Sequence, residues 1–249
     1  VQTCALPISL ENGVQRFVLI STDKAVSPVS VYGASKMLCE KLILQYSKKA
    51  SNKQKFMFVR FGNVLGSRGS ILPLFQQQIK TGGPVTVTDK EMERFFMTIP
   101  EACSLVLETG GVGENGKSYL LDMGEPLKII DMAEQIIKFS GLEPGKDIEI
   151  KIIGAREGER VYEPLWLPEE NPKETEYEKL LVLKNIEFGD EKLNELLTSL
   201  YPICHFDEKE PRAAELFRNK EQLISILRKN IPSLDEFYRT TEKNASMNL

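Results

Sequence analysis

The chain has 249 residues, of which 41% are hydrophobic and 27% are charged, a composition that can build a globular core. Its formal net charge of −4 argues against a general binder of nucleic acid or of an anionic membrane, because neither polyanion would be attracted to the chain as a whole. No stretch is apolar enough to span a bilayer, so we predict no membrane contact for this part of the protein.

The four cysteines and the single histidine are scattered along the sequence without the spacing of metal ligands. We therefore predict no metal site. Unpaired, scattered cysteines are typical of a reducing compartment, which predicts a cytoplasmic protein. Anchoring of the intact protein to the cytoplasmic face of the inner membrane stays open.

The first segment, VQTCALPI (residues 1–8), resembles the in-frame translation of a sequencing adapter. We interpret residues 1–9 as a cloning scar, because the segment has no initiator Met and the fold is expected to begin in mid-domain directly after it. The alternative is a genuine N-terminal strand.

Apolar runs alternate with amphipathic segments over the next part of the chain. In chain order we expect a strand at 16–21, a helix at 31–46 with Ser30 as its cap, a strand at 55–61, a helix at 71–80, a strand at 85–88, a helix at 101–109, a strand at 118–122, a helix at 129–140 and a strand at 148–153. This alternation predicts an α/β fold with a parallel sheet and right-handed crossovers.

From about residue 171 the composition shifts to Glu, Lys and Leu. We expect amphipathic helices at 190–200 and 212–230 and see no catalytic pattern there. The predicted organisation is therefore a scar at 1–9, one domain at 10–165 and a helical C-terminal appendage at 166–249.

A literal G-x-G-x-x-G lies at residues 111–116. The dinucleotide fingerprint needs a strand before it and a helix after it, so that the helix N-terminus meets the pyrophosphate. Here a helix is expected before it and a strand after it. We therefore interpret this stretch as a turn and not as a cofactor site.

Polar residues follow the first expected strand, where Thr22, Asp23 and Lys24 lie at its carboxyl end. Ligands of open α/β sheets bind at such strand ends. Tyr32 and Lys36 are four residues apart on the following helix, so they share one face. A lysine ammonium beside a tyrosine hydroxyl favours the phenolate, which makes Tyr32 a candidate general base. A Tyr and a Lys four residues apart are common as surface neighbours on helices. Their position after a strand that ends in polar residues favours a catalytic pair over surface neighbours.

Five motifs in order, STDKAVSPVSVYGASK, VRFGNVLGSRGSILPLF, ERFFMTIPEA, YLLDMGEPLKI and GAREGERVYE, resemble the CapD-like polysaccharide-biosynthesis family. These are extended short-chain dehydrogenase/reductase proteins that include UDP-N-acetylglucosamine 4,6-dehydratases. The resemblance covers roughly residues 15–163. It implies the C-terminal half of a Rossmann-type parallel sheet with a small substrate-binding subdomain, a UDP-sugar substrate, NAD rather than NADP, and a homo-oligomer.

The resemblance also implies roles for the residues at the strand end. Hydride would leave sugar carbon 4 for NAD, with Tyr32 as the base and Lys36 binding the nicotinamide ribose. Lys24 would then remove the proton of carbon 5, and Asp23 would protonate the hydroxyl that departs from carbon 6. Lys24 must be neutral for this task, which burial or the neighbouring cation Lys36 would favour. A simple ion pair between Asp23 and Lys24 is the less favoured interpretation.

Four further residues match substrate-binding positions of the family. Asn63 would hydrogen-bond the sugar, Arg94 and Arg156 would grip the pyrophosphate, and Glu159 would lie near the nucleotide ribose. The alternatives are a turn residue for Asn63 and solvated charges for the others.

The leading hypothesis is an NAD-dependent UDP-N-acetylglucosamine 4,6-dehydratase, a lyase. A UDP-sugar epimerase and a non-catalytic nucleotide-sugar-binding or assembly module are the alternatives. Many long, membrane-anchored members have Met in place of Tyr32, so retaining or inverting stereochemistry stays open. Because the phosphate-binding loop is expected upstream of residue 1, we expect this chain alone to be inactive, to bind NAD weakly and to expose a strand edge that limits its solubility.

Overall fold

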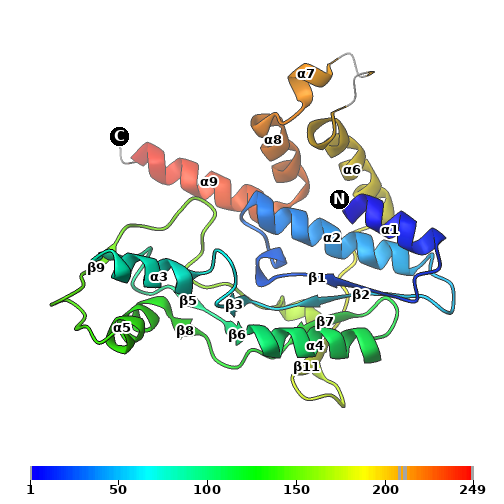
Figure 1. Cartoon of the computed structure of the whole chain (residues 1–249). Coiled ribbons are helices and arrows are strands. Elements are labelled where there is room, and N and C mark those ends of the chain that lie inside the picture. The colour runs from blue at the N-terminus through cyan, green and yellow to red at the C-terminus, as the bar shows by residue number, and fades with distance from the viewer. Residues whose placement is uncertain (1, 207–208, 210–211, 248–249) are drawn as a thin grey trace.

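A five-stranded sheet lies at the centre of the molecule (Figure 1). The computed structural model describes residues 2–206, 209 and 212–247. The strand order is β1-β2-β7-β11-β10, with bounds β1 (Arg16–Ile20), β2 (Lys55–Arg60), β7 (Ser118–Leu121), β11 (Leu180–Leu183) and β10 (Lys173–Glu174). The first three strands run parallel, and β11 and β10 add to them in antiparallel register.

Helices cover both faces of this sheet (Figure 1). One face carries α2 (Val31–Ser47), and the other carries α4 (Ile99–Val112). The strands that these helices cover are nearly continuous apolar runs, because a strand in a parallel sheet is buried on both sides. In β2, for example, Phe56, Met57 and Val59 are fully buried.

A small subdomain follows the sheet's second strand, with its own apolar core around Phe75, Val85 and Ile137. Its helices are α3 (Ile71–Lys80) and α5 (Ile129–Phe139). Three two-stranded pairs belong to this region: β3 (Asn63–Leu65) with β6 (Phe96–Thr98), β4 (Val85–Val87) with β9 (Ile150–Ile152), and β5 (Glu93–Arg94) with β8 (Leu127–Lys128).

The C-terminal helices pack on the outer side of α2 and share one core with it. Their bounds are α6 (Asp190–Cys204), α7 (Ala213–Leu216), α8 (Lys220–Asn230) and α9 (Pro232–Met247). Leu196, Leu227 and Leu234 are buried in this core. The C-terminal segment is therefore tied to the helix that carries Tyr32.

Ten expected elements are present with small shifts at their ends. The predicted helix at 71–80 matches α3, and the strand at 16–21 ends one residue early as β1. The G-x-G-x-x-G at 111–116 joins the end of α4 to β7, so the turn interpretation is confirmed. A Cβ on Gly113 would lie 2.2 Å from the Met57 sulfur, which explains a glycine at this position by close packing.

Two expectations were wrong. A strand was the alternative to a scar for residues 1–8, but Gln2–Glu11 forms helix α1, which buries Leu6 in the core that it shares with α2; the scar itself stays a prediction. The predicted helix at 212–230 is broken into α7 and α8, because the chain turns at Arg218, whose φ is +60°. The C-terminal part is helical as expected, and the segment from residue 166 also contributes β10 and β11 to the central sheet.

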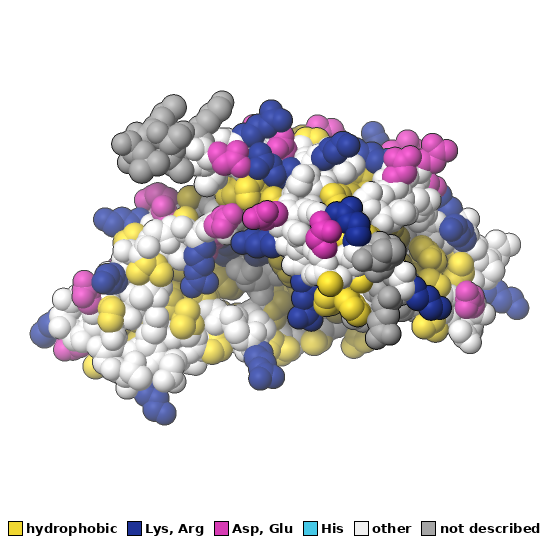
Figure 2. Space-filling view, turned by 90° about the horizontal axis from the view of Figure 1, so that it is seen from above, with side chains coloured by type: hydrophobic (Ala, Val, Ile, Leu, Met, Phe, Trp, Pro, Cys, Tyr) yellow, Lys and Arg dark blue, Asp and Glu magenta, His cyan; other side chains and the backbone are white. Residues whose placement is uncertain are grey.

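Charged side chains of both signs are interspersed over the face seen from above, in keeping with the small net charge (Figure 2). This face is hollowed near its middle, with Lys and Arg side chains at the margin of the hollow (Figure 2). Within the described ranges, no helix is long and apolar enough to cross a membrane.

Candidate active site

A cleft of about 670 Å³ lies between the carboxyl ends of β1 and β2 and the small subdomain. Seven of the nine residues singled out from the sequence line it: Thr22, Lys24, Tyr32, Asn63, Arg94, Arg156 and Glu159. Asp23 and Lys36 do not belong to this lining. The cleft therefore stands where ligands of open α/β sheets bind.

The backbone after β1 aims a short polar segment at the cleft. The chain stays hydrogen-bonded to β2, because the Ser21 N–H donates to the Val59 carbonyl at 2.8 Å and the Asp23 N–H to the Phe61 carbonyl at 3.1 Å. It then turns through the 3-10 helix η1 (Asp23–Ala25). The side chain of Thr22 accepts from the Lys24 N–H as the cap of this turn.

Asp23 and Lys24 form an ion pair at 2.9 Å between Nζ and Oδ1. The Lys24 ammonium also donates to Asn63 Oδ1 at 3.3 Å, which joins the ends of two neighbouring strands. Asp23 is wholly buried, with Oδ1 accepting from the Thr22 hydroxyl at 2.8 Å. Its other oxygen, Oδ2, has no hydrogen-bond partner among the described residues. Lys24 thus lies between the cleft and a buried carboxyl group, whereas the sequence had suggested that both face the ligand.

Tyr32 and Lys36 share one face of α2 but have different surroundings. The Tyr32 side chain is about half exposed and lines the cleft. Lys36 Nζ donates to the Ile20 carbonyl at 3.1 Å, at the carboxyl end of β1. The shared helix face is therefore as predicted, but the ammonium is held by the backbone of the edge strand.

Gly33 allows α2 to approach the η1 turn closely. The helix begins after Ser30, whose hydroxyl accepts from the Gly33 N–H at 3.1 Å as the predicted cap. A Cβ on Gly33 would lie 2.2 Å from the Lys24 carbonyl oxygen and 3.0 Å from the Pro28 Cβ. The absence of a side chain at Gly33 therefore allows the first turn of α2 to lie against the backbone of Lys24.

The Gly33→Ala variant is expected to lose about 1–3 kcal/mol of unfolding free energy, because overpacking forces the helix or the turn to move. Urea denaturation followed by circular dichroism measures this loss. The matched control is Gly111→Ala, since a Cβ there meets nothing within 4 Å. That variant, in the last turn of α4, should be neutral or stabilised by up to about 1 kcal/mol. Equal losses in both variants would contradict the close approach at Gly33.

Arg94 is buried and its guanidinium is engaged by the chain itself. It donates to the carbonyls of Glu93, Val161 and Arg160 at 2.7, 2.9 and 2.6 Å. Its Nη2 lies 4.0 Å from Glu159 and 3.9 Å from Glu163. Contact with a pyrophosphate stays a prediction; what the geometry provides is an anchor for residues 159–163 against β5.

Arg156 and Glu159 belong to the loop that closes this side of the cleft. Arg156 is exposed, and its backbone N–H donates to Glu159 Oε2 at 3.0 Å. The other Glu159 oxygen accepts from the Thr88 hydroxyl at 3.4 Å. Glu159 is therefore held in the loop by specific contacts and is not simply a solvated charge.

A buried charge network lies beneath the strand ends. Arg60, at the end of β2, is 2% exposed and makes two hydrogen bonds each with Glu40 of α2 and with Glu170 of η2 (Pro168–Glu170), all between 2.8 and 3.1 Å. The Ser21 hydroxyl donates to Glu40 at 2.5 Å. Burial alone would lower the pKa of Arg60, but the two carboxylates raise it above its usual value. The network joins β1, β2, α2 and the C-terminal segment.

Comparison with known proteins identifies the family. Residues 2–185 match the model of a family described as "Polysaccharide biosynthesis protein", which is most of the chain. The chain belongs to this family. The resemblance read from the five motifs is thereby confirmed.

Relatives within the family have different described activities. The chain is 50% identical over 170 residues to the capsular polysaccharide biosynthesis protein CapD of Staphylococcus aureus, covering 68% of this chain and 28% of CapD. It is 33% identical to the inverting UDP-N-acetylglucosamine 4,6-dehydratase of Campylobacter jejuni, covering 72% and 52%. It is 37% identical to the UDP-glucose 4-epimerase of Rickettsia canadensis, covering 68% and 48%. The chain thus spans a quarter to a half of these relatives.

The X-ray structure of Pen from Bacillus thuringiensis superposes with a TM-score of 0.68 at 33% identity, covering 74% of this chain and 57% of Pen. The similarity confirms the Rossmann-type α/β fold expected for the family.

The sequence analysis did not consider Glu163, which lies on the wall of the cleft. It is only 4% exposed, lines the cleft, and lies 3.9 Å from Arg94 and 4.0 Å from Arg160. Burial raises the pKa of Glu163, while Lys24 lowers it and Asp23 raises it further. The signal was available, because Glu163 ends the motif GAREGERVYE, in which only Arg156 and Glu159 were considered.

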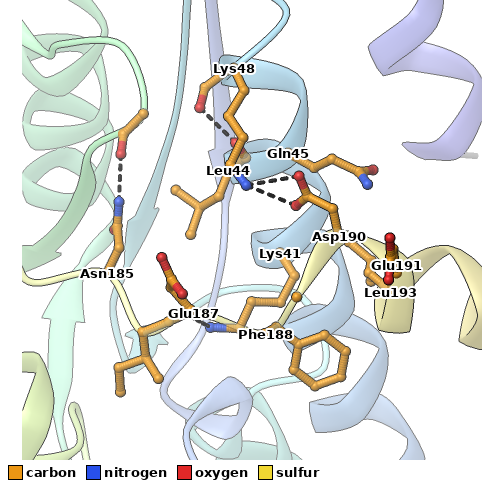
Figure 3. Close-up of a pocket in the computed structure, with 14 residues that line it drawn as sticks. Lys41, Leu44, Gln45, Lys48, Asn185, Glu187, Phe188, Asp190, Glu191 and Leu193 are labelled. Atoms are coloured by element: carbon orange, nitrogen blue, oxygen red, sulfur yellow. Dashed lines mark hydrogen bonds and ion pairs between the residues drawn. The ribbon is translucent and has the colours of Figure 1, made fainter.

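A second pocket, of about 530 Å³, lies between α2 and the start of α6 and contains none of the predicted site residues (Figure 3). Lys48 pairs with Asp190 at 2.8 Å, and Lys41 donates to the Ile186 carbonyl at 3.0 Å (Figure 3). Burial lowers the pKa of Lys41, which the carboxylates of Glu40 and Glu170 oppose. These contacts attach the C-terminal segment to α2.

Proposed function

We propose that this family member is the catalytic part of an NAD-dependent UDP-N-acetylglucosamine 4,6-dehydratase. The observation that carries the proposal is the Lys24–Asp23 pair at 2.9 Å, opening on the same cleft as Tyr32. An elimination needs an acid and a base beside the group that removes the hydroxyl proton. Tyr32 would remove the hydroxyl proton, and the Lys24–Asp23 pair would provide the base and the acid.

One proton transfer within the pair creates both catalytic groups. Movement of a proton from Lys24 Nζ to Asp23 Oδ1 along their contact leaves an amine and a carboxylic acid. The amine faces the cleft and takes the proton of sugar carbon 5. The acid lies behind it, so the proton that Asp23 gives to the departing hydroxyl passes through Lys24. The Asn63 oxygen holds Lys24 in place for this exchange.

The residues present fit a nicotinamide dinucleotide. The Tyr32 hydroxyl lies at the cleft, and the Lys36 ammonium is held at the carboxyl end of β1, where such ligands bind in this kind of sheet. Tyr32 and Lys36 would hold the nicotinamide ribose. NAD, when bound, would accept the hydride of carbon 4 and return it to carbon 6.

The cleft also suits the diphosphate of a nucleotide sugar. Ser70 and Ile71 at the N-terminus of α3 line it, together with Arg68 and Arg156. The Ser70 hydroxyl is buried without a partner among the described residues and makes no cap bond. A helix N-terminus with free N–H groups and nearby cations attracts phosphate.

A UDP-sugar 4-epimerase is the second candidate, favoured by the match to the Rickettsia canadensis relative. Epimerisation needs Tyr32 and the cofactor but no proton transfer by Lys24 and Asp23. The two activities, dehydration and epimerisation, therefore differ in whether Lys24 acts as a base.

The test incubates the full-length protein with NAD and UDP-N-acetylglucosamine and follows the sugar by NMR. We expect a 4-keto-6-deoxy product. A 4-epimer as the product would assign the epimerase instead, and an unchanged sugar despite binding would favour a non-catalytic module. UDP-glucose, tested in parallel, measures the preference for the N-acetyl group.

A further inference from the structure

The carboxylate of Glu163 is buried on the wall of the cleft and accepts no hydrogen bond from any described residue. The other buried glutamates of the described chain differ, because Glu40 and Glu170 each accept three hydrogen bonds. Buried polar groups are nearly always paired, since an unpaired one lowers stability. Glu163 therefore has acceptor capacity that the chain itself leaves unused.

Two guanidinium groups flank the Glu163 carboxylate, one beside each oxygen. Arg94 Nη2 lies 3.9 Å from Oε1 and Arg160 Nη1 lies 4.0 Å from Oε2, and both distances are too long for a hydrogen bond. The hydrogen bonds of these groups go to the backbone instead, because Arg94 donates to three carbonyls and Arg160 donates to those of Val26 and Ser27. The two arginines thus compensate the charge of the carboxylate but leave its lone pairs free.

Arg160 ties this carboxylate to the end of the cleft where Lys24 lies. The Nη1 atom that faces Glu163 also donates at 3.1 Å to the carbonyl of Val26, the residue that ends the η1 turn containing Lys24. The end of the cleft that attracts phosphate is formed by another part of the chain, with Ser70 at the start of α3. The carboxylate therefore lies on the side expected for the hexose and not on that of the diphosphate.

We infer that Glu163 is a specificity residue of the cleft: its carboxylate accepts a hydrogen bond from a hydroxyl group of the hexose. A charged acceptor makes a shorter and stronger hydrogen bond than a neutral one. A site that is built to bind a hydroxyl discriminates against ligands that lack it, because the buried acceptor is then left unpaired. The inference rests on the proposed function, since it assumes that the cleft takes a UDP sugar.

The stability of the free protein gives a first check. Burial raises the pKa of Glu163, which means that the folded state disfavours the ionised carboxylate. We therefore expect the melting temperature of Glu163→Gln, measured without ligand, to stay at or above that of wild type. Glu170→Gln should melt lower, because it removes the charge of a carboxylate that Arg60 contacts at 2.9 Å.

Calorimetry on the full-length protein measures what the hexose adds to binding, as the affinity for UDP-N-acetylglucosamine relative to that for UDP. The protein is loaded with NADH, which cannot accept the hydride of carbon 4, so the sugar is bound without being converted. In Glu163→Gln we expect this ratio to fall by on the order of tenfold, with the UDP affinity unchanged. Glu170→Gln is the matched control, because Glu170 is as buried as Glu163 but does not line the cleft. Its ratio should equal that of wild type.

Analogues of UDP-N-acetylglucosamine that each lack one hydroxyl, at carbon 3, 4 or 6, test the contact itself. One of them should bind wild type on the order of tenfold more weakly than the parent sugar, but should lose little in Glu163→Gln, where the partner is already gone. Equal losses in both proteins for every analogue would show that no hydroxyl contacts Glu163.

A ratio in Glu163→Gln equal to that of wild type would overturn the inference and leave the proposed function intact. Equal losses of UDP and UDP-N-acetylglucosamine affinity would also overturn it, because they would assign Glu163 to the shape of the cleft wall. If wild type does not bind UDP-N-acetylglucosamine, the proposed function fails, and the inference fails with it.

Discussion

Replacing Lys24 with alanine is expected to lower the rate of 4-keto-6-deoxy sugar formation by on the order of 10²–10⁴-fold, the usual worth of a positioned general base. Lys24 is the member of the acid–base pair that reaches the cleft, with its side chain 31% exposed against 0% for Asp23. Without the amine, no group connects the buried carboxyl to the sugar. UDP affinity should change little, because the diphosphate is expected at the α3 end of the cleft.

Lys24→Arg separates charge from basicity. A guanidinium can keep the contacts with Asp23 and Asn63, but it does not lose its proton in proteins. We therefore expect this variant to be as inactive as Lys24→Ala while its stability stays closer to wild type. Steady-state kinetics in the full-length protein measure both variants. Lys48→Ala is the matched control, because Lys48 is 64% exposed and pairs with Asp190 in the second pocket. Near-normal turnover in Lys24→Arg would exclude Lys24 as the base.

The sequence was sufficient to locate the cleft, because its walls begin at local signals. A strand that ends in Ser-Thr-Asp-Lys, followed by a helix that is capped six residues later at Ser30, places Thr22, Lys24 and Tyr32 near one another. The Gly–Asn after the second strand adds Asn63 by the same geometry. These positions depend on short stretches of chain and on the parallel arrangement of the strands. The hydrophobic periodicity of the sequence predicts both.

What the sequence could not reveal is set by contacts between distant segments. Arg94 is held by carbonyls at positions 160 and 161, and Lys36 is held by the Ile20 carbonyl. No pattern near either residue indicates such a partner. β11 is similar: a short apolar run in a charged segment becomes a strand only because the edge of β7 is available to it. Its neighbours in sequence suggested helix.

The Arg60 network is another feature that only the fold reveals, since its three charges come from positions 40, 60 and 170. A single Arg at the end of a strand looks in sequence like an ordinary surface charge. In the structure it is the bidentate partner of two buried carboxylates, which links the helix carrying Tyr32 to the C-terminal segment. That difference leads to the largest stability effect expected in the molecule.

Arg60→Ala is expected to lower the free energy of unfolding by about 3–5 kcal/mol, because removing one member of a buried ion network leaves the others buried without compensation. Two like charges, Glu40 and Glu170, would face each other across the vacated space. Arg60→Lys should restore only part of the loss, since an ammonium cannot make two parallel hydrogen bonds to each carboxylate. Urea denaturation of the full chain at neutral pH measures these values.

Arg239→Ala is the matched control. Its side chain is 69% exposed and pairs with Asp235 at 2.7 Å, so its loss should cost less than about 1 kcal/mol. A deficit that equals that of Arg239→Ala would show that the buried carboxylates are not what makes Arg60 necessary.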